Sequence, residues 1–299
     1  IEVVRGPLAS LYGAEAMGGV IQLFTRQPAK KFELDTALEG AWTNSTRGGD
    51  HWQGNARISA PVADQLALSV GVAESQRQAV GSALDPRLSD LEGVHKTDLS
   101  ARVRWTPGEH QRIDVEHRNG RESRWFNTIE KSGKRRLYES DTDIGRDHDA
   151  LTWSADWSAS AGAPVRDMNT VLRAYRSQLK MTNSRTNGVA ALRPNALDDR
   201  VVDGQWSAHA GATHFVLGGV ELRDERLDNE GLPGGEASAT HRSVFLQDEW
   251  TPRQNLTVTT GLRHDAHERF GARWSRFSLA HWWPIPCRGA RSRHQWLIA

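Results

Sequence analysis

Apolar and polar residues alternate along most of the chain. In Leu66–Val72 and Leu99–Trp105, every second residue is apolar, and the residues between them are small, polar or charged. Side chains of a β-strand point to two opposite faces in turn, so this pattern predicts strands with one apolar and one polar face. Two segments, residues 169–176 and 243–250, have mixed faces, and their orientation is not predicted. The pattern predicts about eleven strands, near residues 32–42, 52–60, 66–72, 99–105, 111–118, 151–157, 169–176, 201–209, 215–222, 243–250 and 256–262.

The connections between these segments alternate between short and long. Short turns at one end of the strands and long loops at the other are typical of an outer-membrane β-barrel, whereas a soluble sandwich has no reason to sort its loops. The long connections are rich in Gly, Asn, Asp, Ser and Arg. The short turns lie near residues 61–64, 106–109, 211–213 and 251–254, and the long loops near residues 76–96, 121–146, 182–198 and 225–240.

Tryptophans are concentrated at the ends of the predicted strands. An indole ring suits a membrane–water interface because it is apolar and its N–H needs a polar partner. The alternative is that the rings anchor the core of a soluble β-sandwich. Trp153 and Trp157 lie within a predicted strand and do not discriminate. The tryptophans predicted at strand ends are Trp42, Trp52, Trp105, Trp125, Trp250 and Trp274.

Composition narrows the protein classes further. The chain has 38 basic and 37 acidic residues, which is not the charge excess of a nucleic-acid binder. The single cysteine, Cys287, excludes a disulfide within the chain and a cysteine-based metal site. Mean hydropathy is −0.61. That value suits a soluble protein, but also a β-barrel, in which only every second strand residue is apolar.

No motif for covalent chemistry is present. The sequence has no G-x-S-x-G nucleophile motif, no phosphate-binding loop and no H-E-x-x-H zinc motif. The nearest metal-like group is His264, Asp265, His267 and Glu268, which we interpret as a polar strand end that enters a loop. We therefore expect no enzymatic activity, no cofactor and no metal.

Residues 1–28 contain three short motifs in one register. Arg5-Gly6-Pro7, Leu11-Tyr12-Gly13 and the segment Ala16–Ile21 occur in an order and at a spacing that resemble the end of the plug domain of TonB-dependent outer-membrane receptors. The resemblance implies that residues 1–28 are the C-terminal part of a plug. It also implies that the TonB-binding segment at the start of a plug is absent from this chain.

A second resemblance lies near the end of the alternating region. Phe245–Trp250, Leu256–Asp265 and His267–Gly271 are similar to a strand pair and loop of ferric-catecholate siderophore receptors, the ferric enterobactin and colicin I receptor branch. This family has a 22-stranded barrel closed by a plug, as expected at that strand number. The resemblance implies an all-β fold in which residues 29–283 are the N-terminal half of a transmembrane antiparallel barrel, about 11–12 of 22 strands.

The family resemblance also implies a function. Its members lie in the outer membrane of Gram-negative bacteria and take up ferric siderophores, with energy from the TonB complex. The expected partners of an intact parent protein are therefore a ferric siderophore, with the catecholate type favoured, the TonB complex and outer-membrane lipid. No nucleic acid is expected.

Site roles follow from the resemblance and from charge. Arg5 matches the plug arginine that pairs with wall glutamates in the family, and Glu249 is its candidate partner; alternatively, Arg5 only caps a turn. Cations and an aromatic ring in the loop near residues 121–146 suit an anionic chelate. These ligand candidates are Arg121, Arg124, Trp125, Lys131, Lys134, Arg135 and Arg136.

The polar face of the predicted strands carries many charges. In a barrel this face would line a wet interior or meet a plug, and in a soluble β-protein it would face water. The charged positions are Arg102, Arg104, Arg112, Asp114, Glu116, Arg118, Asp203 and Arg263.

The last residues depart from the family pattern. Residues 284–299 show no alternation and contain Cys287, and the family motif expected after Trp283 does not follow. We hypothesise that this tail is frameshifted, and that the product stops near a twelfth strand. A half-barrel has two open edges, which hydrocarbon does not tolerate, so we expect the chain to be inactive alone.

Two other classes remain open at this point. A soluble all-β binding or structural protein would account for the alternation, and its two sheets would cover each other's apolar faces. A β-barrel membrane enzyme, such as a lipase or protease, is disfavoured because the nucleophile motif is missing.

Overall fold

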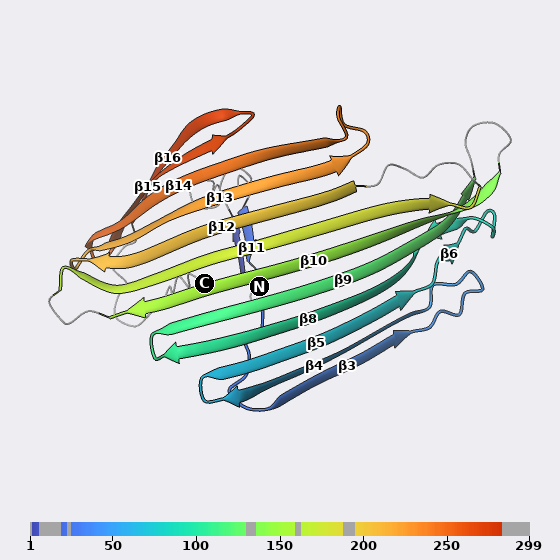
Figure 1. Cartoon of the computed structure of the whole chain (residues 1–299), viewed down its shortest axis with the longest axis horizontal. Coiled ribbons are helices and arrows are strands. Elements are labelled where there is room, and N and C mark those ends of the chain that lie inside the picture. The colour runs from blue at the N-terminus through green and yellow to red at the C-terminus, as the bar shows by residue number, and fades with distance from the viewer. Residues whose placement is uncertain are drawn as a thin grey trace.

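Twelve antiparallel strands form one large curved sheet (Figure 1). The computed structural model describes residues 2–5, 19–22, 25–129, 136–158, 163–187 and 195–282. In this part of the chain no helix is long and apolar enough to cross a membrane. The strands are β1 Glu2–Arg5, β2 Gly19–Gln22, β3 Glu33–Ala41, β4 His51–Ala63, β5 Leu66–Arg77, β6 Val80–Gly81, β7 Ser89–Leu91, β8 Gly93–Gly108, β9 Gln111–Ile129, β10 Leu137–Trp157, β11 Val165–Arg185, β12 Asn195–Ala210, β13 His214–Asn229, β14 Glu236–Arg253, β15 Leu256–His267 and β16 Gly271–Trp282.

The order of strands in the sheet follows the order in the chain. It runs from β3 at one edge through β4, β5 and β8 to β16 at the other, and the β6–β7 hairpin forms a separate small sheet between β5 and β8. Each strand pairs with its neighbour in the antiparallel direction, and a short turn, such as the one between Gly108 and Gln111, sets the register of its own pair. The predicted all-β partial barrel is confirmed, with β16 as a twelfth strand. The predicted domain boundaries stay predictions, and the tail from residue 284 lies outside the described residues.

Several strands are much longer than the alternating pattern predicts. β10 and β11 have 21 residues each, and β9 has 19. The loop predicted near residues 121–146 is therefore wrong in extent, because β9 continues to Ile129 and β10 begins at Leu137. A transmembrane β-strand needs about 9–11 residues. Beyond that length both faces of a strand contact water, so the alternation ends although the backbone ladder continues.

The outer face of the sheet carries an apolar band. On most strands the band covers four outward positions over seven residues, for example Leu99 to Trp105 on β8. On β14 it includes Val244, Leu246 and Trp250, with the carboxylate of Asp248 between the last two. The registers place Leu172 of β11 and Val244 of β14 in this band. They therefore give the orientation of residues 169–176 and 243–250, whose faces are mixed in the sequence. These side chains are exposed although they are hydrophobic: Leu68, Val70, Val72, Leu99, Val103, Trp105, Val115, Leu151, Leu172, Val202, Val220, Leu222, Val244, Leu246, Trp250 and Leu262.

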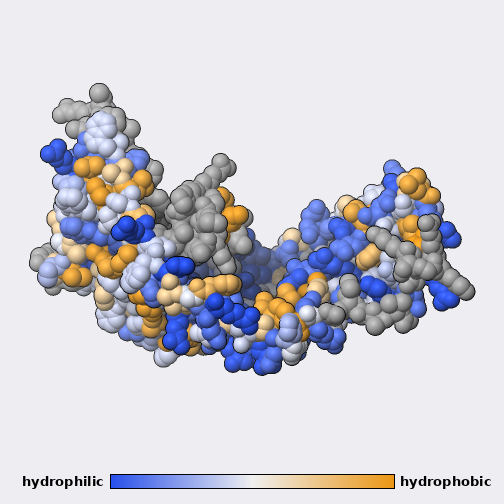
Figure 2. Space-filling view, turned by 90° about the horizontal axis from the view of Figure 1, so that it is seen from above, coloured by the Kyte–Doolittle hydropathy of each residue, from blue (hydrophilic) through white to orange (hydrophobic). Residues whose placement is uncertain are grey.

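The inner face is polar, and it lies on the hollow side of the curved sheet. Figure 2 shows the sheet bent into an open trough, with hydrophilic residues visible in the hollow. The registers place Arg102 opposite Glu116 and Arg104 opposite Asp114, and Arg173 opposite Asp203. The charged polar face predicted from the sequence is therefore confirmed as one surface.

Among the residues that the structure describes, no second sheet packs on the apolar face. Buried hydrophobic residues in the described ranges are few and mostly small. They are Ala29, Ile144, Ala155, Val201, Ala208, Leu217 and Phe245. A soluble sandwich buries its core between two sheets about 10 Å apart, so the soluble all-β alternative is not supported by this architecture. The exposed apolar band instead has the alternation expected of a lipid-facing barrel wall.

Tryptophans lie toward both ends of the strands. At the loop end lie Trp42, Trp52, Trp125 and Trp274, as predicted. The prediction that Trp157 lies in the middle of a strand is wrong, because this residue is the last one of β10. The other tryptophans near the short turns all point to the outer face; they are Trp105, Trp153, Trp206, Trp250 and Trp282.

Replacing an outer-face residue by arginine tests whether the band contacts lipid. Val220 is 57% exposed near the middle of the band. We expect Val220→Arg to lower the free energy of unfolding in a bilayer by about 2–4 kcal/mol, because a cation at the membrane midplane is costly. Urea titration of these variants within a barrel completed by further strands and folded into liposomes measures this. Thr259→Arg is the control, because Thr259 lies on the inner face opposite Glu249; equal losses in the two variants would contradict a lipid-facing band.

Close packing on the inner face gives a second test at Gly219. A Cβ there would lie 2.6 Å from the Phe245 ring and 2.8 Å from the carbonyl oxygen of Gly204. We expect Gly219→Ala to destabilise the sheet by about 1–3 kcal/mol, because the backbone must shift to make room. Gly108→Ala is the control, because a Cβ at Gly108 meets nothing within 4 Å. The same urea titration would contradict this packing if both variants were equally stable.

Candidate functional site

Residues 25–29, called the docked segment below, lie against the inner face of the sheet. Arg57 of β4 donates from Nη2 to the carbonyl oxygen of Gln27 at 3.0 Å. Arg104 of β8 donates from Nη2 to the side-chain amide oxygen of the same residue. Gln27 is therefore held through both its backbone and its side chain, by arginines from two strands.

Arg102 extends this contact by two residues. Its Nη2 donates to Thr25 Oγ1 at 3.0 Å, and its Nη1 donates to the carbonyl oxygen of Arg26 at 3.4 Å. Arg26 in turn pairs with Asp35 of β3, with 2.8 Å between Nη1 and Oδ2. The hydrogen bond and charge of that carboxylate raise the pKa of Arg26 above its ordinary value. The docked segment is thus bonded to three strands of the wall.

A buried hydrogen bond ends the docked segment. The amide of Ala29 donates to Ser59 Oγ at 2.7 Å. Ser59 is completely buried and Ala29 is 8% exposed. A buried amide without an acceptor is costly, so this serine satisfies a donor that no strand partner reaches.

Carboxylates of β9 orient the arginines of β8. Asp114 accepts from Arg104 Nε at 2.8 Å and from Arg104 Nη2 at 3.0 Å, and Glu116 accepts from Arg102. All four side chains point inward because they occupy alternate positions on neighbouring strands. Bidentate pairing fixes a guanidinium plane, which leaves its remaining N–H groups directed toward the docked segment.

The chemistry of the site is reversible attachment. A neutral hydrogen bond contributes about 1 kcal/mol net and one that involves a charged group about 1.5–3 kcal/mol, so no single bond holds the segment. Together the bonds from Arg57, Arg102, Arg104 and Ser59 fix it in one place. Arg57, Arg102 and Arg104 keep their carboxylate partners on the wall when the segment is released, whereas Arg26 of the segment loses its partner Asp35.

The sequence identified only part of this site. Arg102 and Arg104 were predicted on a face that would meet a plug, and the structure places both against residues 25–27. Arg57 and Ser59 were missed. Both lie in the predicted strand near residues 52–60, at positions that alternate with Ile58, but nothing in their spacing indicates a partner 30 residues away.

The predicted pair of Arg5 and Glu249 stays a prediction. Arg5 is the last residue of β1 and pairs through its backbone with Gly19 of β2. Its side chain lies outside the description. Glu249 is half-buried on the inner face of β14, which is the face that such a contact would need.

The predicted ligand residues do not share one loop. Arg121, Arg124 and Trp125 lie within β9. Arg124 points inward, where it pairs with Glu122 and with Glu92. Arg136 is exposed between strands, and Lys131, Lys134 and Arg135 lie outside the described residues. The role of these residues in binding stays a prediction.

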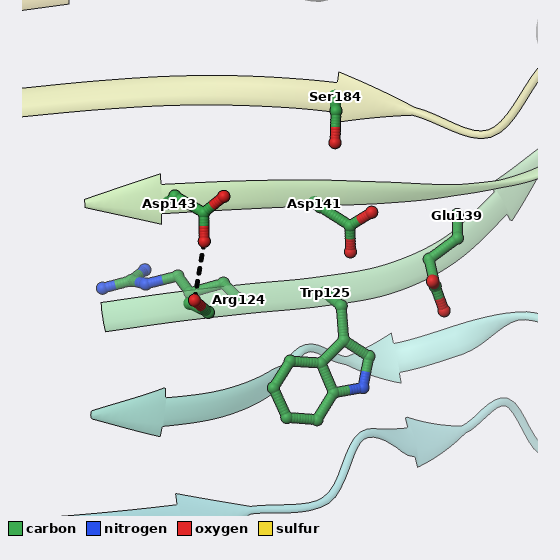
Figure 3. Close-up of a pocket in the computed structure, with 7 residues that line it drawn as sticks. Arg124, Trp125, Glu139, Asp141, Asp143 and Ser184 are labelled. Carbon is green, nitrogen blue, oxygen red and sulfur yellow. Dashed lines mark hydrogen bonds between the residues drawn. The ribbon is translucent and has the colours of Figure 1, made fainter. Parts of the chain in front are cut away.

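Two of these candidates point to the outer face. Arg121 lies 3.4 Å from Asp147 and does not reach the hollow side of the sheet. Trp125 lines an outer-face hollow near the strand tips, together with the carboxylates of Glu139, Asp141 and Asp143 (Figure 3). Three carboxylates beside the ring disfavour an anionic ligand in this hollow.

The metal-like residues at the end of β15 are divided between faces. Asp265 and His267 point inward, whereas His264 points outward and contacts Trp274 with ring centroids 4.6 Å apart. Within the described ranges, no three His, Cys, Asp or Glu residues form a group suited to a metal ion.

No protein-family model matches this chain, but curated relatives do. It is 25% identical to the iron-regulated outer membrane virulence protein of Vibrio cholerae over 284 residues. It is 23% identical to the ferric enterobactin receptor PirA of Pseudomonas aeruginosa, and 20% identical to a probable TonB-dependent siderophore receptor of Acinetobacter baumannii. These alignments cover 92% of this chain but only 40% to 42% of each relative.

Solved structures share the fold. The siderophore receptor PirA of Pseudomonas aeruginosa matches with a TM-score of 0.72 at 22% identity, over 93% of this chain and 45% of that protein. The ferric enterobactin receptor PfeA of the same organism matches with a TM-score of 0.77 at 17% identity, over the same shares. In sequence and in fold, the chain is therefore similar to a part, less than half in length, of the TonB-dependent siderophore receptors of the ferric enterobactin branch.

Proposed function

We propose that this chain is part of an outer-membrane receptor for energy-coupled uptake of a ferric siderophore, with the catecholate type favoured. The observation that carries the proposal is the docked segment, which binds the polar inner face of a sheet whose outer face is apolar. This is the arrangement of a plug attached to a barrel wall. The names of the relatives support the substrate class and a location in the outer membrane of a Gram-negative bacterium.

The inner face suits passage of a charged chelate. Its arginines are compensated by carboxylates, as in the pairs Arg146–Glu122 and Arg173–Asp203. A wall of compensated charges is wettable but does not hold an anion at one point. We propose that the TonB complex acts through plug residues before the docked segment, and that the chain performs no covalent chemistry.

Barrel closure would require further strands. In the described sheet, β3 and β16 each have one unpaired edge. Open edges are not tolerated in hydrocarbon, because their N–H and C=O groups lack partners. We propose that strands outside the described residues complete the barrel of the working receptor.

Removing the Ser59 hydroxyl tests the attachment of the docked segment. We expect Ser59→Ala to accelerate amide exchange at Ala29 about fivefold, because loss of one hydrogen bond costs about 1 kcal/mol. Hydrogen exchange of the folded chain in detergent, read by mass spectrometry, measures this. Ser243→Ala is the control, because Ser243 is also buried and its hydroxyl has no partner. Unchanged exchange at Ala29 would show that the segment is not held there.

A chimera tests the function itself. Residues 33–282 would replace the corresponding part of Pseudomonas aeruginosa PirA, which supplies the rest of the plug and barrel. We expect uptake of radioactive iron as ferric enterobactin by a receptor-deficient strain, while the 299-residue chain alone gives none. A chimera that assembles in the outer membrane but supports no uptake of ferric enterobactin or other ferric catecholates would refute the proposed substrate class.

A further inference from the structure

The inner face of the sheet is not polar throughout. Apolar side chains gather on the inner face of β10 to β14, which are neighbouring strands of the sheet (Figure 1). Leu197 of β12 is directly paired with Leu179 of β11 and with Leu227 of β13. Six residues form this inner apolar patch: Ile144, Leu179, Met181, Leu197, Leu227 and Ala237.

The registers fix the face and the level of the inner apolar patch. On β12, Leu197 and the inward Asp203 occupy alternate positions, so both point to the hollow side of the sheet. Leu197 lies beyond the lipid-facing Val202, toward the long connection between β11 and β12. Long connections mark the external side of an outer-membrane barrel. The patch therefore faces the lumen at its external mouth and cannot contact lipid.

The wall leaves much of the inner apolar patch uncovered. Leu197 is 41% exposed, and among the six residues only Ile144, at 9%, is close to buried. The other four are half-buried. Apolar side chains that gather on an otherwise charged surface are typical of a binding surface, because burial by a ligand removes them from water.

The charged residues that border the patch are paired with one another. Arg146 Nη1 lies 2.8 Å from Glu122 Oε2. Arg223 lies 3.1 Å from Asp199 and 3.4 Å from Glu225. These cations are already occupied, so the border does not select an anionic group. The patch itself suits the uncharged, apolar part of a ligand.

A ferric catecholate has such a part. Its negative charge lies on the oxygen atoms that bind iron, whereas the outer edges of its aromatic rings are C–H groups. Aromatic rings bury a large apolar surface when they pack on aliphatic side chains. We propose that the inner apolar patch binds the catechol ring edges of the chelate at the external mouth of the lumen. This inference rests on the proposed function, because it assigns a contact to the chelate that the receptor takes up.

Plug residues are the competing occupant of the patch. The docked segment, however, is held by hydrogen bonds to Arg57, Arg102 and Arg104, near the short turns of β4 and β8. The inner apolar patch lies on other strands and near the long connections. A ligand that arrives from outside therefore meets the patch before it meets the docked segment.

The test measures chelate binding by the chimera of residues 33–282 with Pseudomonas aeruginosa PirA, purified in neutral detergent. Quenching of tryptophan fluorescence gives the Kd of ferric enterobactin and of a ferric tris-catecholate whose ring edges carry sulfonate groups. The variants are Leu197→Gln and the conservative Leu197→Met. Val94→Gln is the matched control, because Val94 lies on the inner face of β8, outside the patch but toward the same end of the strands.

We expect Leu197→Gln to bind ferric enterobactin about fivefold more weakly, because a ring edge no longer buries apolar surface there. Leu197→Met and Val94→Gln should bind it within about twofold of the unaltered chimera. The sulfonated chelate should bind weakly and equally to all four proteins, because its charged ring edges do not suit the patch.

Four results would overturn this inference: unchanged binding of ferric enterobactin by Leu197→Gln, an equal loss in Leu197→Met, an equal loss in Val94→Gln, or the same loss with the sulfonated chelate. Faster amide exchange of the docked segment in ligand-free Leu197→Gln would assign the patch to the plug and overturn it as well. If the unaltered chimera binds no ferric siderophore, the proposed function itself fails; binding that does not depend on Leu197 overturns this inference alone.

Discussion

The structure depends on continuous hydrogen bonding between neighbouring strand backbones. In an apolar surrounding, every backbone N–H and C=O needs an internal partner. The antiparallel ladder from β3 to β16 supplies these partners without a second layer of structure. That is why the sheet can leave side chains such as Leu246 more than half exposed and still be an ordered wall.

The ladder also creates the two surfaces on which function depends. Because neighbouring strands are in register, side chains at alternate positions line up across the sheet and face the same side. The inner side collects paired charges such as Arg104 and Asp114, and these pairs bind the docked segment. The outer side collects apolar residues, with cations such as Arg176 beyond them. One periodicity therefore accounts for the attachment of the N-terminal segment and for the apolar outer band.

Register determines the contacts that matter most. Arg102 and Glu116 meet because β8 and β9 pair at that offset, and a shift by one residue would send both to the outer face. Short turns such as the one between Gly108 and Gln111 set this offset locally. The site is therefore built from local hairpins, although the segment that it binds is between 30 and 77 residues away in sequence.

The sequence by itself determined the all-β class, the two faces of most strands, the sorted turns and the family resemblance, because each is written in local spacing. It also indicated that Arg102 and Arg104 lie on the polar face. Only the tertiary structure decided the length of β9 to β11, the orientation of Leu172 and Val244, and the partners Arg57 and Ser59. Strands continue where the alternation fades because the backbone ladder does not depend on side-chain polarity, and distant partners meet only after the sheet has formed and curved.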